Sequence, residues 1–333
     1  MIEIVKNKEV AQENVICDDL EQFKTDIENG LQENPKTIPS MYFYDKKGDA
    51  LFQEIMNLPE YYLTRSELDI FKNKTDQLIK AMDLQADSYF ELIELGAGDG
   101  LKTKELLKSL DTNNFKFDYF PIDISSNALD LLEKDLNEVL PNVSVKTKQG
   151  DYFKVLDALK MSKKPKIILF LGSNIGNMTD DLASAFISKL GANLAPGDKL
   201  LLGVDLIKSK DIVLPAYDDS KGVTAAFNIN VLERINTQLD ANFDLSQFKH
   251  SPEYNEKEGI AISFIESKSD QTVAVKAIGK SFHFEKGEKI QTEVSRKYND
   301  VLISKIILNT DFKLDTKIMD NKAYFADYIL TRY

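Results

Sequence analysis

Short β-rich runs alternate with segments of helical spacing over residues 88–207, and this alternation restricts the chain to few folds. The strand-like runs lie at 89–95, 117–124, 143–148, 166–171 and 199–206. The helical segments between them lie at 102–110, 127–140 and 179–193. The run at 166–171 is nearly all apolar, as expected of a strand that is covered on both faces. Strands that alternate with helices predict a doubly wound, parallel α/β sheet.

The flanking segments predict a second domain and a closing hairpin. Helical spacing is found at 12–30, 49–56, 65–82, 221–239 and 299–308, and strand-like runs at 260–266, 271–277, 280–284, 312–319 and 324–333. The last helix and hairpin would complete a seven-stranded sheet. We therefore expect a sheet domain of 67–207 plus 298–333, and a second domain that combines 1–66 with the insert 208–297.

Charge and cysteine content narrow the setting and the partners. The chain has 42 Lys and Arg against 54 Asp and Glu, a net charge of −12, which argues against a general nucleic-acid binder. No apolar run approaches the roughly 18 residues of a membrane span, and the first residues do not resemble a signal peptide. With the single cysteine Cys17 and two distant histidines, a metal site is not expected. We expect a cytoplasmic protein without membrane, nucleic-acid or metal partners.

Three successive strand ends carry glycines or acids. Gly96 opens a Gly-x-Gly-x-Gly turn after the first strand, where glycine lets a ligand approach the backbone. Asp123 ends the second strand, and Asp151 follows the third with Tyr152 beside it. Each acid alone is typical of a turn or a helix cap. Together they favour a nucleoside ligand, with acids for the ribose and adenine and a ring for stacking. Leu101 stands where a dinucleotide fingerprint needs its third glycine, which disfavours an NAD-dependent oxidoreductase.

The fourth strand ends in a polar loop with the sequence Gly-Ser-Asn-Ile-Gly-Asn at 172–177. Doubly wound folds place their chemistry at the carboxyl ends of such strands. An ordinary loop with an Asx turn is the alternative interpretation. Up to this point the residues predict a nucleoside-dependent α/β enzyme, with no reaction specified.

A longer set of motifs specifies the reaction. Residues 36–66 include Lys-Thr-Ile-Pro-Ser-Met-Tyr-Phe-Tyr-Asp and Leu-Pro-Glu-Tyr-Tyr-Leu-Thr-Arg-Ser. Together with 94–103, 170–177, 202–206, 216–228 and 287–295, they resemble the histidine-specific Nα-methyltransferases of ergothioneine biosynthesis, over about residues 20–300. The resemblance implies a class I, Rossmann-like, seven-stranded methyltransferase domain with a second substrate-recognition domain. It also implies S-adenosylmethionine (SAM) as methyl donor and trimethylation of the α-amine of L-histidine to hercynine.

The resemblance further implies the site residues. The cofactor residues are Gly96, Lys102, Asp123, Asp151 and Tyr152. The substrate residues are Phe52, Tyr62, Gly172, Asn177, Tyr217, Ser263, Glu293 and Ser295. Asn177 is expected to hold the amine, Tyr62 and Tyr217 the carboxylate, and Glu293 and Ser295 the imidazole. Tyr44 is the candidate proton acceptor through water, so Tyr44 and Asn177 are the predicted catalytic residues.

Two positions depart from the family pattern. The family's imidazole-pocket methionine falls on Ser263, unless a one-residue shift brings in Ile262, and the C-terminal hairpin lacks the usual tryptophan. The first departure leaves the same chemistry on another amino acid or biogenic amine as an alternative. A non-catalytic SAM-binding protein is a second alternative. We expect a monomer that acts on a small amino-acid substrate.

Overall fold

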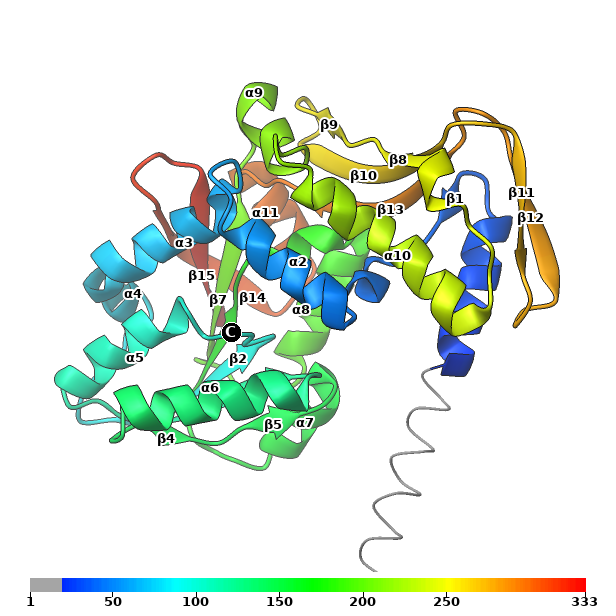
Figure 1. Ribbon diagram of the computed structural model, residues 1–333. Helices are drawn as coiled ribbons and strands as arrows, with labels where there is room; N and C mark the ends of the chain where they lie inside the picture. The colour runs from blue at the N-terminus through cyan, green and yellow to red at the C-terminus, as the bar shows by residue number, and fades with distance from the viewer. Residues whose placement is uncertain (1–19) are drawn as a thin grey trace, which may run out of the picture. The chain divides into compact units, whose positions relative to one another are not determined.

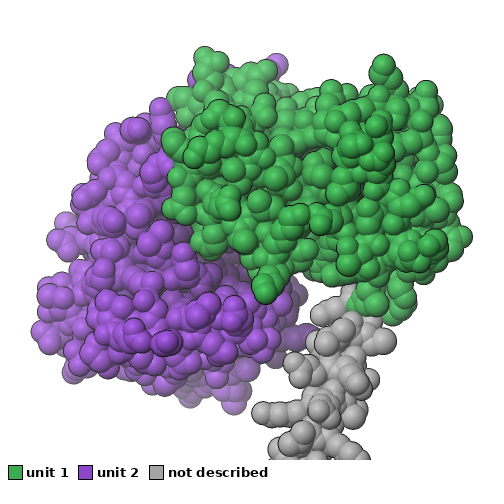
Figure 2. Space-filling model, in the orientation of Figure 1, with its two compact units in different colours: residues 1–61, 210–255, 261–294 green, residues 62–209, 256–260, 295–333 purple. Residues whose placement is uncertain are grey.

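The computed structural model describes residues 20–333 (Figure 1). Contacts divide the chain into two compact units, which Figure 2 colours separately. Unit 1 consists of Met1–Tyr61, Lys210–Asn255 and Ala261–Val294, and unit 2 of Tyr62–Ser209, Glu256–Ile260 and Ser295–Tyr333. Compared with the predicted domain boundaries, this division also assigns residues 62–66, 208–209, 256–260 and 295–297 to the sheet unit.

Unit 2 is built on one large mixed sheet. Its strands are β2 (Tyr89–Leu95), β3 (Lys116–Asp123), β4 (Ser144–Val145), β5 (Lys148–Gln149), β6 (Lys166–Phe170), β7 (Lys199–Asp205), β14 (Phe312–Met319) and β15 (Phe325–Arg332). Their order is β14-β15-β7-β6-β2-β3-β4, with β5 also paired to β3. All pairs among β2 to β7 are parallel, whereas β15 is antiparallel to both β7 and β14. Because β4 and β5 share one edge position, the sheet has the predicted seven-strand arrangement.

Helices cover both faces of this sheet. They are α3 (Tyr62–Asn73), α4 (Thr75–Ala81), α5 (Thr103–Thr112), α6 (Ser126–Val139), α7 (Tyr152–Leu159), α8 (Asp180–Gly191) and α11 (Asp300–Ile307). Ile93 and Ile168 pack with Phe186 of α8 on one face, and the alternate residue Leu92 packs with Leu106 of α5 on the other. Successive strand residues point to opposite faces, so a strand such as β6 is buried on both sides and reads as continuously apolar.

Two predicted elements of unit 2 are divided in the structure. The helix expected over 65–82 is two helices, α3 and α4, with a break at Lys74. The strand expected at 143–148 is the pair of short segments β4 and β5. Neither break contains a proline or a glycine. Packing of α4 and edge pairing along β3 decide these boundaries instead. Of the helix predicted at 12–30, residues 12–19 lie outside the described part, and the described helix runs over 20–32.

Unit 1 combines a second sheet with a long helix. The strands are β1 (Lys36–Thr37), β8 (Phe248–His250), β9 (Glu253–Asn255), β10 (Ile260–Ser267) and β13 (Lys289–Arg296), in the order β1-β13-β10-β8 with β9 beside β10. A separate hairpin is formed by β11 (Gln271–Val275) and β12 (Lys280–Phe284). The helices are η1 (Ser40–Phe43), α2 (Lys46–Met56), α9 (Lys210–Val213), η3 (Leu214–Ala216), α10 (Val223–Leu239) and η4 (Leu245–Gln247). Strand β13 was not among the predicted strands. Val231 and Ile235 of α10 share one buried core with Ile265 and Ile290 of the sheet.

Over residues 20–333, no helix combines the length and the apolar character needed to cross a membrane.

Candidate active site

Three glycines turn the chain from β2 toward α5. Gly96, Gly98 and Gly100 have φ angles of +73°, +53° and +61°, a region that glycine enters without steric cost. The Gly96 amide donates to the backbone oxygen of Ile122 at 2.8 Å. A Cβ at Gly96 would lie only 2.8 Å from Tyr152 Oη. The glycine turn and the Tyr152 hydroxyl therefore border the same space.

The two predicted acids occupy the ends of neighbouring strands. Asp123 Oδ2 accepts from the Gly98 amide at 3.2 Å, and its Oδ1 accepts from the Ser125 amide at 3.0 Å. Asp151 caps α7, and its Oδ1 accepts from two amides of the first helical turn at 3.0 and 3.1 Å. Burial, followed by the charges of Asp123 and Asp151, raises the pKa of Tyr152 to about 12. The Tyr152 ring is therefore neutral at physiological pH.

Lys102 and Gly172 meet at the buried carboxylate of Glu67. The Lys102 ammonium forms an ion pair with Glu67 Oε2, and the Gly172 amide lies 3.0 and 2.9 Å from the two carboxylate oxygens. A Cβ at Gly172 would lie 3.4 Å from Lys102 Nζ and 3.7 Å from Asn174 Nδ2. A Cβ at Gly96 would lie 3.7 Å from the same Asn174 nitrogen. The turn after β2 and the loop after β6 thus face one another.

Asn177 lies at the end of η2 (Asn174–Asn177), where its side chain is exposed. The preceding Ser173 has φ +60°, and its Oγ accepts from the Asp205 amide at 3.0 Å. This bond fixes the start of the loop to the end of β7. The loop therefore presents Asn177 from a position that is anchored to the sheet.

Tyr62 belongs to a buried network of charges at the end of β7. Its hydroxyl donates to Asp205 Oδ2 at 2.7 Å, and Lys208 Nζ lies 3.1 Å from the Tyr62 oxygen. Lys297 Nζ is 2.9 Å from Asp205 Oδ2 and 2.9 Å from Ser295 Oγ. Burial would raise the pKa of Asp205, but the charges of Lys297 and Lys208 outweigh it and lower that pKa. The predicted substrate residues Tyr62 and Ser295 are therefore linked through one ionised carboxylate and two lysines.

In unit 1, aromatic rings surround the predicted catalytic residue Tyr44. The Tyr44 ring makes edge contacts with Phe52 at 5.6 Å and with Phe227 of α10 at 5.7 Å between centroids. The side chain keeps 44% of its surface exposed. Partial burial, and then the charge of Glu293, raises the pKa of the Tyr44 hydroxyl. The phenol is therefore protonated at neutral pH.

Ser263 and Glu293 are neighbours on adjacent strands. Ser263 Oγ donates to Glu293 Oε2 at 3.3 Å, and the serine is buried. Thr292 Oγ1 lies 2.9 Å from both the Ser263 backbone oxygen and Asn228 Oδ1. Strand alternation puts Ile262 on the opposite face of β10 from Ser263. No one-residue shift is therefore needed to bring position 263 beside Glu293.

The loop that carries Tyr217 is held by backbone contacts. The His250 ring donates from Nε2 to the Tyr217 backbone oxygen at 2.7 Å. Burial lowers the pKa of His250, which keeps the ring neutral. Asp219 closes the loop onto α10, because its carboxylate accepts from the amides of Thr224 at 2.7 Å and Val223 at 3.0 Å. These bonds fix the backbone on both sides of the Tyr217 side chain.

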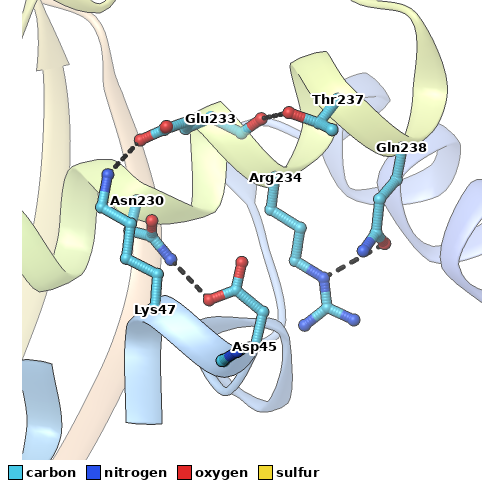
Figure 3. Close-up of a pocket in the computed structure, with 8 residues that line it drawn as sticks. Asp45, Lys47, Asn230, Glu233, Arg234, Thr237 and Gln238 are labelled. Atoms are coloured by element: carbon cyan, nitrogen blue, oxygen red, sulfur yellow. Dashed lines mark hydrogen bonds and ion pairs between the residues drawn. The ribbon is translucent and has the colours of Figure 1, made fainter. Parts of the chain in front are cut away.

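A surface pocket of unit 1 contains none of the predicted site residues. It is lined by Asp45, Lys46, Lys47, Asn230, Glu233, Arg234, Thr237 and Gln238, from α2, its N-cap and α10 (Figure 3). Figure 3 shows Lys47 paired with Glu233 and Asn230 with Asp45, the latter at 2.9 Å. Because these polar groups bind one another, we assign no ligand to this pocket.

The whole chain can now be compared with known proteins. Residues 23–332 match the family described as "Histidine-specific methyltransferase, SAM-dependent". The chain belongs to this family. It is accordingly a SAM-dependent N-methyltransferase that acts on a small amino-acid substrate. The resemblance seen in the sequence and the expected methyl donor are confirmed. The strand order of unit 2 agrees with the predicted seven-stranded α/β fold.

Individual relatives cover most of the chain. Histidine N-alpha-methyltransferase of Mycolicibacterium smegmatis is 36% identical over 84% of this chain and 85% of its own length. Ergothioneine biosynthesis protein 1 of Schizosaccharomyces pombe is 31% identical over 89% of this chain, which corresponds to 39% of that longer protein. A solved S-adenosylmethionine-dependent methyltransferase from Clostridium acetobutylicum has a TM-score of 0.45 and 12% identity, covering 86% of this chain and 97% of that one.

Three residues with contacts to the predicted site residues were themselves not predicted from the sequence: Asp205, Glu67 and Lys297. Asp205 ends the fifth strand, so the strand-end argument that selected Asp123 could also have selected it. Glu67 lies within α3, and Lys297 is one residue beyond β13, so neither has a local signal of this kind. Their importance becomes visible through the contacts they make in the folded chain.

Proposed function

We propose that this methyltransferase trimethylates the α-amine of L-histidine to give hercynine. The observation that carries the proposal is the Glu293 carboxylate beside Ser263, because a carboxylate is an acceptor for an imidazole N–H. The names of the relatives from M. smegmatis and S. pombe support the same substrate and pathway. Unit 1 would serve as the substrate-recognition domain, since it holds Phe52, Tyr217, Ser263 and Glu293 of the expected substrate residues.

The residues after β2 and β3 fit the methyl donor. SAM supplies an activated methyl group when bound. Gly96 leaves open the space beside Tyr152 Oη that a Cβ would fill. Asp123 would accept from the ribose hydroxyls, and the Lys102 ammonium would attract the amino-acid carboxylate of the donor. Asp151 would accept from the adenine amino group, with the neutral Tyr152 ring beside it.

Asn177 would bind the substrate amine, and Tyr44 would assist the removal of its proton. The Asn177 side-chain oxygen would accept from the amine and orient it, and positioning of this kind can contribute on the order of 7–11 kcal/mol. Since the pKa of Tyr44 is raised, its hydroxyl would bind the water that takes up the proton rather than act as a phenolate base. Phe52 would line the wall beside Tyr44 in unit 1.

The substrate carboxylate would be held by charge as well as by hydroxyl groups. The single O–H proton of Tyr62 is used in its bond to Asp205. Lys208, Lys297 and Asp205 together carry one net positive charge, which would attract the carboxylate. Tyr217 would donate to it from its fixed loop. Tyr62 would therefore act as part of a positive network rather than as a lone donor.

The alternative is the same chemistry on another amino acid or biogenic amine. Ser263 motivates it, because a small hydroxyl in place of methionine provides less apolar contact for a ring. The missing contact corresponds to about 1–3 kcal/mol per group. Histidine remains the better proposal, because the Glu293 carboxylate beside Ser263 supplies the acceptor that an imidazole N–H needs.

Mass spectrometry of purified protein incubated with SAM and a panel of amino acids would test the proposal. We expect three successive methyl additions to the α-amine of histidine, with little turnover of the other amino acids. Methylation of the imidazole, or a reaction that stops after one methyl with excess donor, would contradict the proposed product. Preferred turnover of another amine would favour the alternative.

A further inference from the structure

A buried carboxyl group lies beside the predicted cofactor residue Lys102. Asp327 of β15 has no exposed surface, and neither of its oxygens has a hydrogen-bond partner among residues 20–333. An ionised carboxylate in such a place is costly, so the group becomes neutral unless a charge or hydrogen bond compensates it. A buried carboxyl of this kind calls for an explanation of its own.

A missing side chain brings Asp327 close to a second carboxyl. Asp327 is paired with Gly203 of β7 across the sheet. A Cβ at Gly203 would lie 2.1 Å from Glu67 Oε1 and 3.0 Å from Asp327 Oδ1. The two carboxyl groups therefore share the space above this glycine. Two adjacent carboxyls in a buried site do not ionise together readily, and the pKa of one is raised.

The surrounding charges decide which groups are ionised. Burial, and then the charge of Glu67, raises the pKa of Asp327, and Lys102 only partly opposes this. Burial lowers the pKa of Lys102, but the adjacent Glu67 charge outweighs it and raises that pKa, with Glu94 and Asp327 adding to the effect. Burial also raises the pKa of Glu94 to about 7, against two hydrogen bonds from hydroxyl groups. These directions favour a neutral Asp327 beside a charged Lys102.

We propose that Glu67 and Asp327 hold one proton between them and act as a positioning pair for Lys102 and the Gly172 amide. The single negative charge of the pair matches the Lys102 ammonium, which keeps the site receptive to the carboxylate of the methyl donor. Loss of the shared proton places a second negative charge beside Lys102 and weakens the binding of that carboxylate. The inference rests on the proposed role of Lys102 in cofactor binding.

Calorimetry with S-adenosylhomocysteine tests the pair without turnover. Binding would be compared from about pH 6.5 to about pH 9.5 in the wild type, Asp327→Asn, Glu67→Gln and the control Asp300→Asn. The amine of the ligand titrates alike in every case, so the ratio of affinities between variants isolates the protein group. Since one linked proton changes affinity by up to about tenfold per pH unit, we expect the wild type to lose more affinity than Asp327→Asn toward the alkaline end.

The other variants separate positioning from general structure. Glu67→Gln should bind more weakly at neutral pH, because Lys102 loses its ion-pair partner. Its alkaline decline should be smaller than in the wild type, because burial then remains as the main cause that raises the pKa of Asp327. Asp300→Asn should follow the wild type. An Asp327→Asn profile that parallels the wild type overturns the inference. Absence of measurable binding in the wild type would instead contradict the proposed cofactor site.

Infrared spectroscopy gives a second readout that needs no ligand. In the wild-type protein at about pH 7, where free aspartate is ionised, labelling aspartate with ¹³C should shift a band of a protonated carboxyl group. The same band should be missing in Asp327→Asn. If labelling of neither aspartate nor glutamate shifts a protonated-carboxyl band, the shared proton does not exist.

Discussion

Replacement of Glu293 tests the imidazole site at the residue that carries the proposed function. Glu293→Gln removes the negative charge but keeps the size and one acceptor oxygen, whereas Glu293→Ala removes both. Ser263 Oγ donates to Glu293 Oε2 at 3.3 Å, which is long for an O–H donor and therefore competes weakly with a substrate N–H. The change should affect histidine far more than the methyl donor.

The magnitude follows from the type of hydrogen bond lost. A bond to an ionised acceptor contributes about 1.5–3 kcal/mol, and each 1.4 kcal/mol is about tenfold in a rate or binding ratio. We therefore expect kcat/KM for histidine to fall about tenfold in Glu293→Gln, where a neutral acceptor remains. In Glu293→Ala we expect a fall of about a hundredfold.

Initial rates at saturating SAM measure these effects, and calorimetry with S-adenosylhomocysteine checks that the donor site is intact. Ser263→Ala serves as the matched control, because it removes the neighbouring donor and leaves the charge in place. We expect its kcat/KM to stay close to the wild-type value. Normal turnover of histidine by Glu293→Ala would refute the reasoning, since the imidazole would then not be held there.

Three further changes test the sheet unit. Asp123→Ala should weaken binding of the methyl donor by about 1.5–3 kcal/mol, because the ribose loses a charged acceptor; an unchanged calorimetric affinity would exclude this role. Asp205→Asn should lower the free energy of unfolding by about 3–5 kcal/mol, since Lys297 remains buried without its counterion. The lowered pKa of Asp205 means that its contribution is present above about pH 4 and is lost as pH falls, so urea unfolding of wild type and variant should converge in acid. Gly203→Ala should cost about 1–3 kcal/mol in thermal unfolding, because its methyl group would lie 2.1 Å from Glu67 Oε1.

Local sequence patterns were sufficient to predict most of the sheet unit. The strand expected at 89–95 coincides with β2, and the one at 166–171 matches β6 to within one residue. The run at 166–171 is nearly all apolar because both faces of its strand are covered, so the sequence itself indicates burial on two sides. The Gly96 turn and Asp123 followed from the same argument, since parallel strands end at one edge of the sheet.

Other features depended on pairing and packing between distant segments. The C-terminal hairpin was predicted, but its strand pairing places β15 between β7 and β14. The break at Lys74 and the division of the third strand also lack a local signal. Strand β13 was recognised as part of a motif but not as a strand. In each case the partner that stabilises the element lies far away along the chain.

The sequence by itself determined the alternating elements, the strand-end residues and the family resemblance, because each is encoded in neighbouring residues. The tertiary structure alone decided which buried charges meet. Glu67, Lys102 and Asp327 come from α3, the turn before α5 and β15, and they converge because Gly203 has no side chain. Protonation in such a group depends on burial and on neighbours in space, and no local pattern in the sequence contains that information.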